Sequence, residues 1–145
     1  MPRRSQSTPA DRVADAGGLK PALRYPMLWY GLGFAVLLTV GVVSLLPAPD
    51  LAESVSDKSL HFVTYACLAA GFASLVRAST SLVYVAVGLV TYGLLIEILQ
   101  GMTGYRVAEW GDVVANSIGV VVGQFAWWSP LPARLRRLEA RWDKS

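Results

Sequence analysis

Cysteine and histidine are nearly absent from this sequence, which has one of each in 145 residues. Cys67 has no second cysteine to pair with, so no disulfide can form within the chain, and we expect this side chain to serve packing. His61, Glu97 and Asp112 are ligand types that a metal accepts, but one histidine among scattered carboxylates is weak support for a site. We therefore expect no metal and no cofactor.

Charge is also scarce in this chain. Only 16% of the residues are charged, whereas 54% are hydrophobic and the mean hydropathy is +0.44. The apolar residues form four blocks, at residues 27–46, 59–76, 82–100 and 113–128. A soluble helical protein would show a polar face along each helix, and these blocks show almost none. The composition therefore predicts an integral membrane protein.

The length of the blocks predicts how they cross a bilayer. A helix spans about 30 Å of hydrocarbon with roughly 20 residues, which the first three blocks provide. The fourth block must add a turn that includes Asp112, or thin the bilayer locally. We expect an all-α polytopic membrane protein with a four-transmembrane-helix bundle over residues 27–128. Residues 1–26 and 129–145 would be basic tails, the first of them disordered because it is polar and rich in proline and glycine.

The positions of the thirteen Lys and Arg residues predict the orientation. Five lie in each tail and Arg77 lies between the second and third blocks, which leaves only Lys58 and Arg106 for the other two loops. Short segments on the cytoplasmic side retain positive charge, so we expect a multi-pass protein of the cytoplasmic (inner) membrane with both termini in the cytoplasm. This topology accounts for the basic tails without nucleic acid, and the second tail suits anionic membrane lipids.

The outer end of the second block carries a stripe of polar residues. Asp57, His61 and Tyr65 recur at intervals of four, which places a carboxylate, an imidazole and a phenol on one helix face. Ser54 and Asp57 also have the spacing of a capping box, which is a structural alternative for Asp57. A cap explains only the first member of the stripe.

The third block delivers Glu97 and Gln100 to the same depth. A carboxylate inside a bilayer is unfavourable by up to about 3 kcal/mol and should face the bundle interior with a partner. Arg106 follows in a loop whose glycines permit a tight path, so we expect a Glu97–Arg106 ion pair. This pair is either part of a binding site or a closed structural contact.

The fourth block opens with Asp112 and Asn116 and continues on the same face with Gly119 and Gly123. The Gly-x-x-x-Gly spacing lets a neighbouring backbone approach, so we expect these glycines to serve packing. Depth along the helices places Asn116 level with His61 and Glu97. Three helices should thus form one shallow polar pocket at the outer face.

The same residues resemble the VanZ-like family of small bacterial membrane proteins. The resemblance covers about residues 40 to 124 and is carried by Ser44-Leu45-Leu46-Pro47, Asp57-Lys58-x-x-His61-Phe62-x-x-Tyr65, Glu97-x-x-Gln100, Arg106 and Asp112-x-x-x-Asn116-x-x-Gly119-x-x-x-Gly123. It implies a four-helix membrane protein of the cell envelope, with the name member linked to resistance to the glycopeptide antibiotic teicoplanin. It implies no particular reaction.

Three functions are compatible with such a pocket. It can bind or remodel a lipid-linked or anionic envelope component such as a cell-wall precursor, through Lys58 and Arg106. It can be an intramembrane hydrolase or transferase, with His61, Asp57 and Glu97 as candidate catalytic residues. It can also be a structural network that is satisfied internally. The candidate ligand-binding residues are Asp57, Lys58, His61, Tyr65, Glu97, Gln100, Arg106, Asp112 and Asn116.

Overall fold

The structure is a computed structural model, and it describes residues 19–20, 22–47 and 57–142. Every regular element in these ranges is helical, which confirms the all-α prediction. The predicted disorder of the first tail concerns mostly residues that lie outside the description, as does Ser54 of the possible capping box. The elements in chain order are α2 (Pro26–Ser44), α3 (Asp57–Leu75), α4 (Ser81–Met102), α5 (Trp110–Gln124), the 3₁₀ helix η2 (Phe125–Trp128) and α6 (Leu131–Trp142).

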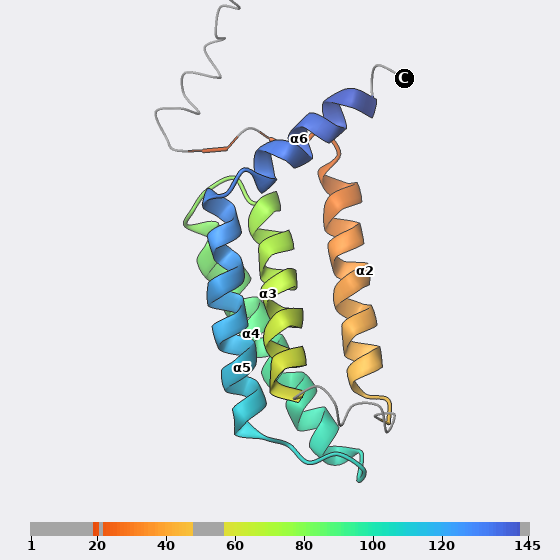
Figure 1. The fold of residues 1–145 in the computed structure, drawn as a ribbon. Helices are drawn as coiled ribbons and strands as arrows, with labels where there is room; N and C mark the ends of the chain where they lie inside the picture. The colour runs from red at the N-terminus through yellow and green to blue at the C-terminus, as the bar shows by residue number, and fades with distance from the viewer. Residues whose placement is uncertain (1–18, 21, 48–56, 143–145) are drawn as a thin grey trace, which may run out of the picture.

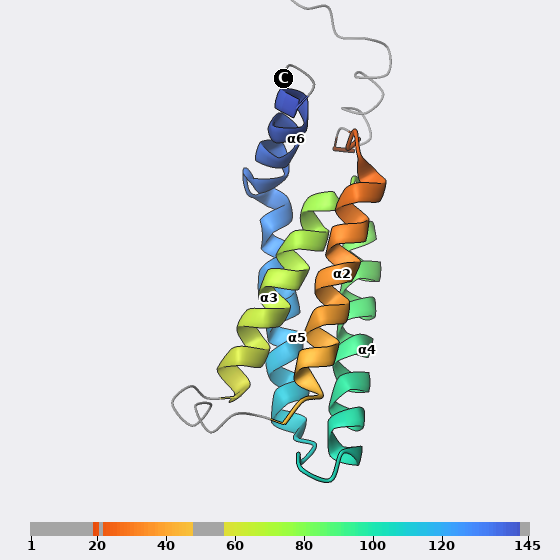
Figure 2. The same ribbon diagram turned by 90° about the vertical axis from the view of Figure 1, so that its right-hand side faces the viewer.

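Helices α2 to α5 lie side by side and alternate in direction, and α6 crosses one end of them (Figures 1 and 2). We call this end the basic end, because it holds α6, residues 22–25 and the turn between α3 and α4 with Arg77. The opposite end holds the starts of α3 and α5 and the loop of residues 103–109, and we call it the polar end. Among the described Lys and Arg residues, only Lys58 and Arg106 lie at the polar end, which is the distribution that the sequence predicts.

Two of the helices, α2 and α4, are long and apolar enough by length and composition to cross a membrane. Helix α3 is as long as α2, with 19 residues, but its first turn is polar. Helix α5 has only 15 residues, and η2 extends it by four. Together α5 and η2 reach about 30 Å, since an α-helix rises about 1.5 Å and a 3₁₀ helix about 2.0 Å per residue. The helical segment therefore extends the predicted fourth block by three residues at its start, Asp112 among them.

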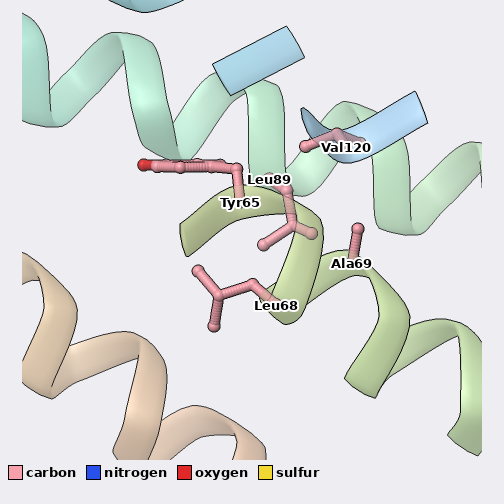
Figure 3. Close-up of a cluster of buried hydrophobic side chains, with 5 residues drawn as sticks. All are labelled: Tyr65, Leu68, Ala69, Leu89 and Val120. Carbon is pink, nitrogen blue, oxygen red and sulfur yellow. The ribbon is translucent and has the colours of Figure 1, made fainter. Parts of the chain in front are cut away.

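Close packing of α3 against α5 forms the centre of the bundle. A Cβ atom at Gly119 would lie 2.4 Å from the carbonyl oxygen of Phe62, and one at Gly123 would lie 2.8 Å from Cβ of Ala69. Both glycines therefore face α3, and their missing side chains let the two backbones meet. Next to this contact, the core cluster in Figure 3 contains Tyr65, Leu68, Ala69, Leu89 and Val120.

Helix α6, which the sequence analysis did not predict, packs across the basic end and is held there by one buried glutamate. The Glu139 carboxylate accepts hydrogen bonds from the backbone N–H groups of Arg24 and Tyr25, both at 3.0 Å, and from the indole of Trp29 at 2.7 Å. Burial raises the pKa of Glu139, but these donors and the charge of Arg136 outweigh burial, and the pKa lies below its ordinary value. A carboxylate from α6 thus caps the start of α2, where the helix dipole favours negative charge.

A candidate functional site at the polar end

Four side chains from α3 and α5 meet at the polar end, and we call Asp57, His61, Asp112 and Asn116 the polar cluster. His61 is its centre. The ring Nδ1 lies 3.1 Å from Oδ1 of Asn116, while Nε2 lies 3.9 Å from Oδ1 of Asp57 and 3.8 Å from Oδ2 of Asp112. An amide oxygen can only accept, so Nδ1 carries the hydrogen and Nε2 faces the two carboxylates.

The close contact of α3 with α5 fixes this geometry. Asn116 lies one turn before Gly119 on α5, and His61 directly precedes Phe62, whose carbonyl oxygen packs over that glycine. Gly93 on α4 leaves room on the third side, because a Cβ there would approach Asn116 Nδ2 at 3.0 Å and the Tyr65 ring at 3.1 Å. Tyr65 therefore lies beside the polar cluster, as its spacing from His61 requires.

Two ion pairs cover the cluster from the side of the loop. Arg106 donates to Oδ2 of Asp57 at 2.7 Å, and Lys58 donates to Oε2 of Glu109 at 2.7 Å. The hydrogen bond and charge of Lys58 hold the pKa of Glu109 below its ordinary value. Both cations of the polar end are thus engaged by carboxylates.

The predicted ion pair between Glu97 and Arg106 is wrong. Oε1 of Glu97 accepts a hydrogen bond from the backbone N–H of Glu109 at 2.6 Å, while Arg106 pairs with Asp57. The loop reaches this arrangement at Gly104, whose φ of +78° is a left-handed conformation that other residues rarely adopt. The path of the loop therefore places the Arg106 guanidinium against α3 and the backbone N–H of Glu109 against Glu97.

Gln100 lies apart from the cluster. Its side chain is 2% exposed and donates to the carbonyl oxygen of Ser44 at 2.9 Å, which ties α4 to the last turn of α2. Tyr105 makes a similar contact, from its hydroxyl to the carbonyl oxygen of Leu45. These bonds satisfy carbonyl groups that a helix leaves open at its C-terminal end. Gln100, which is one of the predicted ligand-binding residues, therefore makes a contact between helices and lies outside the polar cluster.

Three buried polar atoms near the cluster have no hydrogen-bond partner among the described residues: Tyr65 Oη, Glu97 Oε2 and Asp112 Oδ1. Their residues are 3%, 4% and 4% exposed and come from α3, α4 and α5 respectively. A buried polar group without a partner is unfavourable by about 1–3 kcal/mol. Each such atom in a native protein needs an explanation, such as an ordered water, an ion or a functional role.

A groove of about 760 Å³ lies between α2, α3 and α6, on another face of α3. Cys67, which is exposed, lines it together with Val63, Phe72 and other apolar residues, and Arg134 lies at its α6 side. The groove is apolar and does not contain the residues of the polar cluster. The candidate chemistry and this groove are thus separate features.

Comparison with known proteins identifies a family for most of the chain. The family model described as VanZ/LLP1 matches residues 25–131, a range that includes α2 to α5 and every residue of the polar cluster. No curated protein and no solved structure matches the chain.

Proposed function

Because the chain belongs to the VanZ/LLP1 family and is therefore a VanZ-like membrane protein, we propose that it crosses the cytoplasmic membrane four times and binds an envelope lipid at its polar end. The ligand would be a lipid-linked or anionic component, such as a polyprenyl phosphate that carries a cell-wall precursor. The three unpartnered polar atoms beside the cluster are the observation that supports this proposal most directly.

The exposed surface supports the four spans. Large apolar side chains are exposed on every long helix, among them Leu38 (68%) on α2, Val63 (54%) on α3, Val87 (61%) on α4 and Val121 (59%) on α5. A soluble protein rarely leaves such a continuous apolar surface in water. In a bilayer these residues would face lipid, and α2, α3, α4 and the joined α5–η2 segment would each be about long enough to cross it.

The charges support the orientation. Arg77, Lys20 and the arginines of α6 lie at the basic end, and the backbones of Lys20 and Arg77 are joined by a hydrogen bond of 2.8 Å. By the positive-inside rule this end would be cytoplasmic. The polar cluster would then lie at the outer face, where lipid-linked precursors of the cell wall are used.

A head group would be recognised through Arg106 and Lys58. A bound phosphate would replace Asp57 as the partner of Arg106 and Glu109 as the partner of Lys58. A guanidinium can bind phosphate with two parallel hydrogen bonds. Tyr65 and the carboxyl groups of Glu97 and Asp112 would orient the hydroxyl groups of the ligand.

The test is lipid mass spectrometry of the protein purified from its membrane. We expect a polyprenyl phosphate or a lipid-linked saccharide to co-purify with the wild type, and to be reduced at least tenfold in Arg106→Gln. Arg137→Gln is the matched control, because it removes the same charge from an exposed position at the basic end. Equal retention by both variants, or recovery of bulk phospholipids alone, would refute the proposal. Teicoplanin susceptibility of cells that express each variant is the cellular counterpart.

An intramembrane hydrolase or transferase is the second candidate, and the environment of His61 favours it. Asn116 fixes the ring with Nδ1 as the donor, which leaves Nε2 to accept a proton as a general base does. Turnover of the co-purifying lipid that stops in His61→Gln, while binding persists, would select this function over binding alone.

A further inference from the structure

The ring of His61 has an electrostatic conflict in the polar cluster. Its Nδ1 hydrogen points to Asn116, so the lone pair of a neutral Nε2 faces carboxylate oxygens at 3.8 and 3.9 Å. These distances exceed those of an N–H···O hydrogen bond, about 2.7–3.2 Å. Three electron-rich atoms therefore surround one point without touching each other, and a positive charge at that point would remove the conflict.

The spacing of these atoms fits a metal ion. One ligand atom each from Asp57, His61 and Asp112 lies within 4.8 Å of the other two. Nitrogen and carboxylate ligands bind Zn²⁺ at about 2.0–2.2 Å, so two of them on one ion lie up to roughly 4.4 Å apart. The Asp57 side chain is 52% exposed and can close the remaining difference by rotation.

The burial of Asp112 and the hydrogen bond between His61 and Asn116 also support a metal site. The Asp112 side chain is only 6% exposed and faces the ring through Oδ2, while its Oδ1 has no hydrogen-bond partner in the part of the chain that the structure describes. Histidines that bind metals usually donate their other N–H to a neighbouring acceptor, which is the role Asn116 has here.

The carboxyl groups at the polar end also favour a cation. Among the described residues, the four carboxyl groups of Asp57, Glu97, Glu109 and Asp112 lie at this end with two cations, Lys58 and Arg106. Carboxyl groups therefore outnumber cations there, and a bound cation would offset the excess.

We infer that Asp57, His61 and Asp112 bind one divalent transition-metal ion, Zn²⁺ or Mn²⁺. One imidazole and two carboxylates suit these ions, and three protein ligands leave a coordination position open for water or another oxygen ligand. The inference deepens the proposed function, on which it rests for the identity of that ligand: the open position would accept a phosphate oxygen of the lipid head group. The ion explains how an acidic site attracts an anionic ligand.

The test measures metal binding in detergent without added envelope lipid. The protein is stripped with EDTA and titrated with Zn²⁺ or with Mn²⁺, and bound metal is measured by plasma mass spectrometry and calorimetry. We expect one ion per chain for the wild type, with affinity at least tenfold lower in Asp112→Asn and His61→Gln. Asn116→Ala should weaken binding by about 10- to 100-fold, as loss of a second-sphere partner does.

Glu109→Gln is the matched control, because it removes one negative charge from the same end without changing a ligand atom. It should bind metal as the wild type does. Should Asp112→Asn fail to fold, Asp57→Asn replaces it, since that side chain is half exposed.

Binding of less than one ion per chain, or equal affinity in the wild type and the ligand variants, would overturn the inference. NMR spectra of the His61 ring that do not change on addition of Zn²⁺ would lead to the same conclusion. Lipid retention is measured separately, so loss of metal binding with retained lipid refutes only the ion, and the reverse refutes only the lipid.

Discussion

Gly119→Ala tests whether the contact between α3 and α5 sets the geometry of the polar cluster. The new Cβ would lie 2.4 Å from the carbonyl oxygen of Phe62, whereas real Cβ contacts essentially never fall below 3.0 Å. The two helices must therefore part by at least 0.6 Å, the difference between these distances. The blocking atom is backbone, so no side chain can rotate away to relieve the overlap.

Overpacking of this kind destabilises a folded protein by about 1–3 kcal/mol. Gly88→Ala is the matched control, because an added Cβ at this α4 position meets nothing within 4 Å. It should be neutral or more stable by up to about 1 kcal/mol, since alanine favours helix over glycine. The measurement is thermal unfolding of both variants in the same detergent. Equal stability of the two variants would show that α3 and α5 do not touch at Gly119.

The separation also has a local consequence one turn away, at His61. Its 3.1 Å hydrogen bond to Asn116 joins the two helices that must part, so the bond should lengthen and the ring should lose its fixed tautomer. The ring nitrogens of His61, the single histidine, can be followed by NMR. An unchanged histidine spectrum in Gly119→Ala would refute the claim that the helix contact positions the ring.

Three further outcomes follow from the contacts at the two ends. Glu139→Gln should have a lower melting temperature than the wild type at pH 6. This difference should shrink as the pH falls below about 4.5, because a carboxyl group with a lowered pKa stabilises the fold only while it is ionised. Lys58→Met should return the Glu109 pKa toward its ordinary value in an NMR titration, with no measurable change in melting temperature, since the pair is exposed; a fixed pKa would show that Lys58 does not lower it. Gln100→Leu should lower stability by about 1–3 kcal/mol in thermal unfolding, because it leaves the Ser44 carbonyl without its donor, whereas wild-type stability would exclude this role.

Hydropathy predicts most of the fold. The second and third apolar blocks begin and end within two residues of α3 and α4, because both helices bury or expose apolar side chains on nearly every face. Helix α6 escaped prediction because it is rich in arginine. Its apolar residues Leu131, Leu135, Leu138 and Trp142 recur at intervals of four, three and four, and this pattern was the signal that could have indicated a helix.

The candidate site was predictable where it depends on helices. Depth along α3 and α5 brings His61 and Asn116 together, because both helices are regular and their register is fixed by close packing. The partner of Arg106 was not predictable, since it depends on the path of a loop with one left-handed glycine. Glu109 was also missed as a partner of Glu97, because its contribution is a backbone N–H that no side-chain pattern reveals.

The pairing of α3 with α5 also has a consequence for how the chain is made. The two helices that hold His61 are separated by α4, and 34 residues lie between Leu75 and Trp110. At about 5–20 residues per second, a ribosome needs roughly 2 to 7 s to synthesise this interval. During that time Asp57 and His61 of α3 have neither Asp112 nor Asn116 as a partner. The polar end is therefore completed only when α5 has been synthesised, and a chain that stops before Trp110 lacks both Asp112 and Asn116.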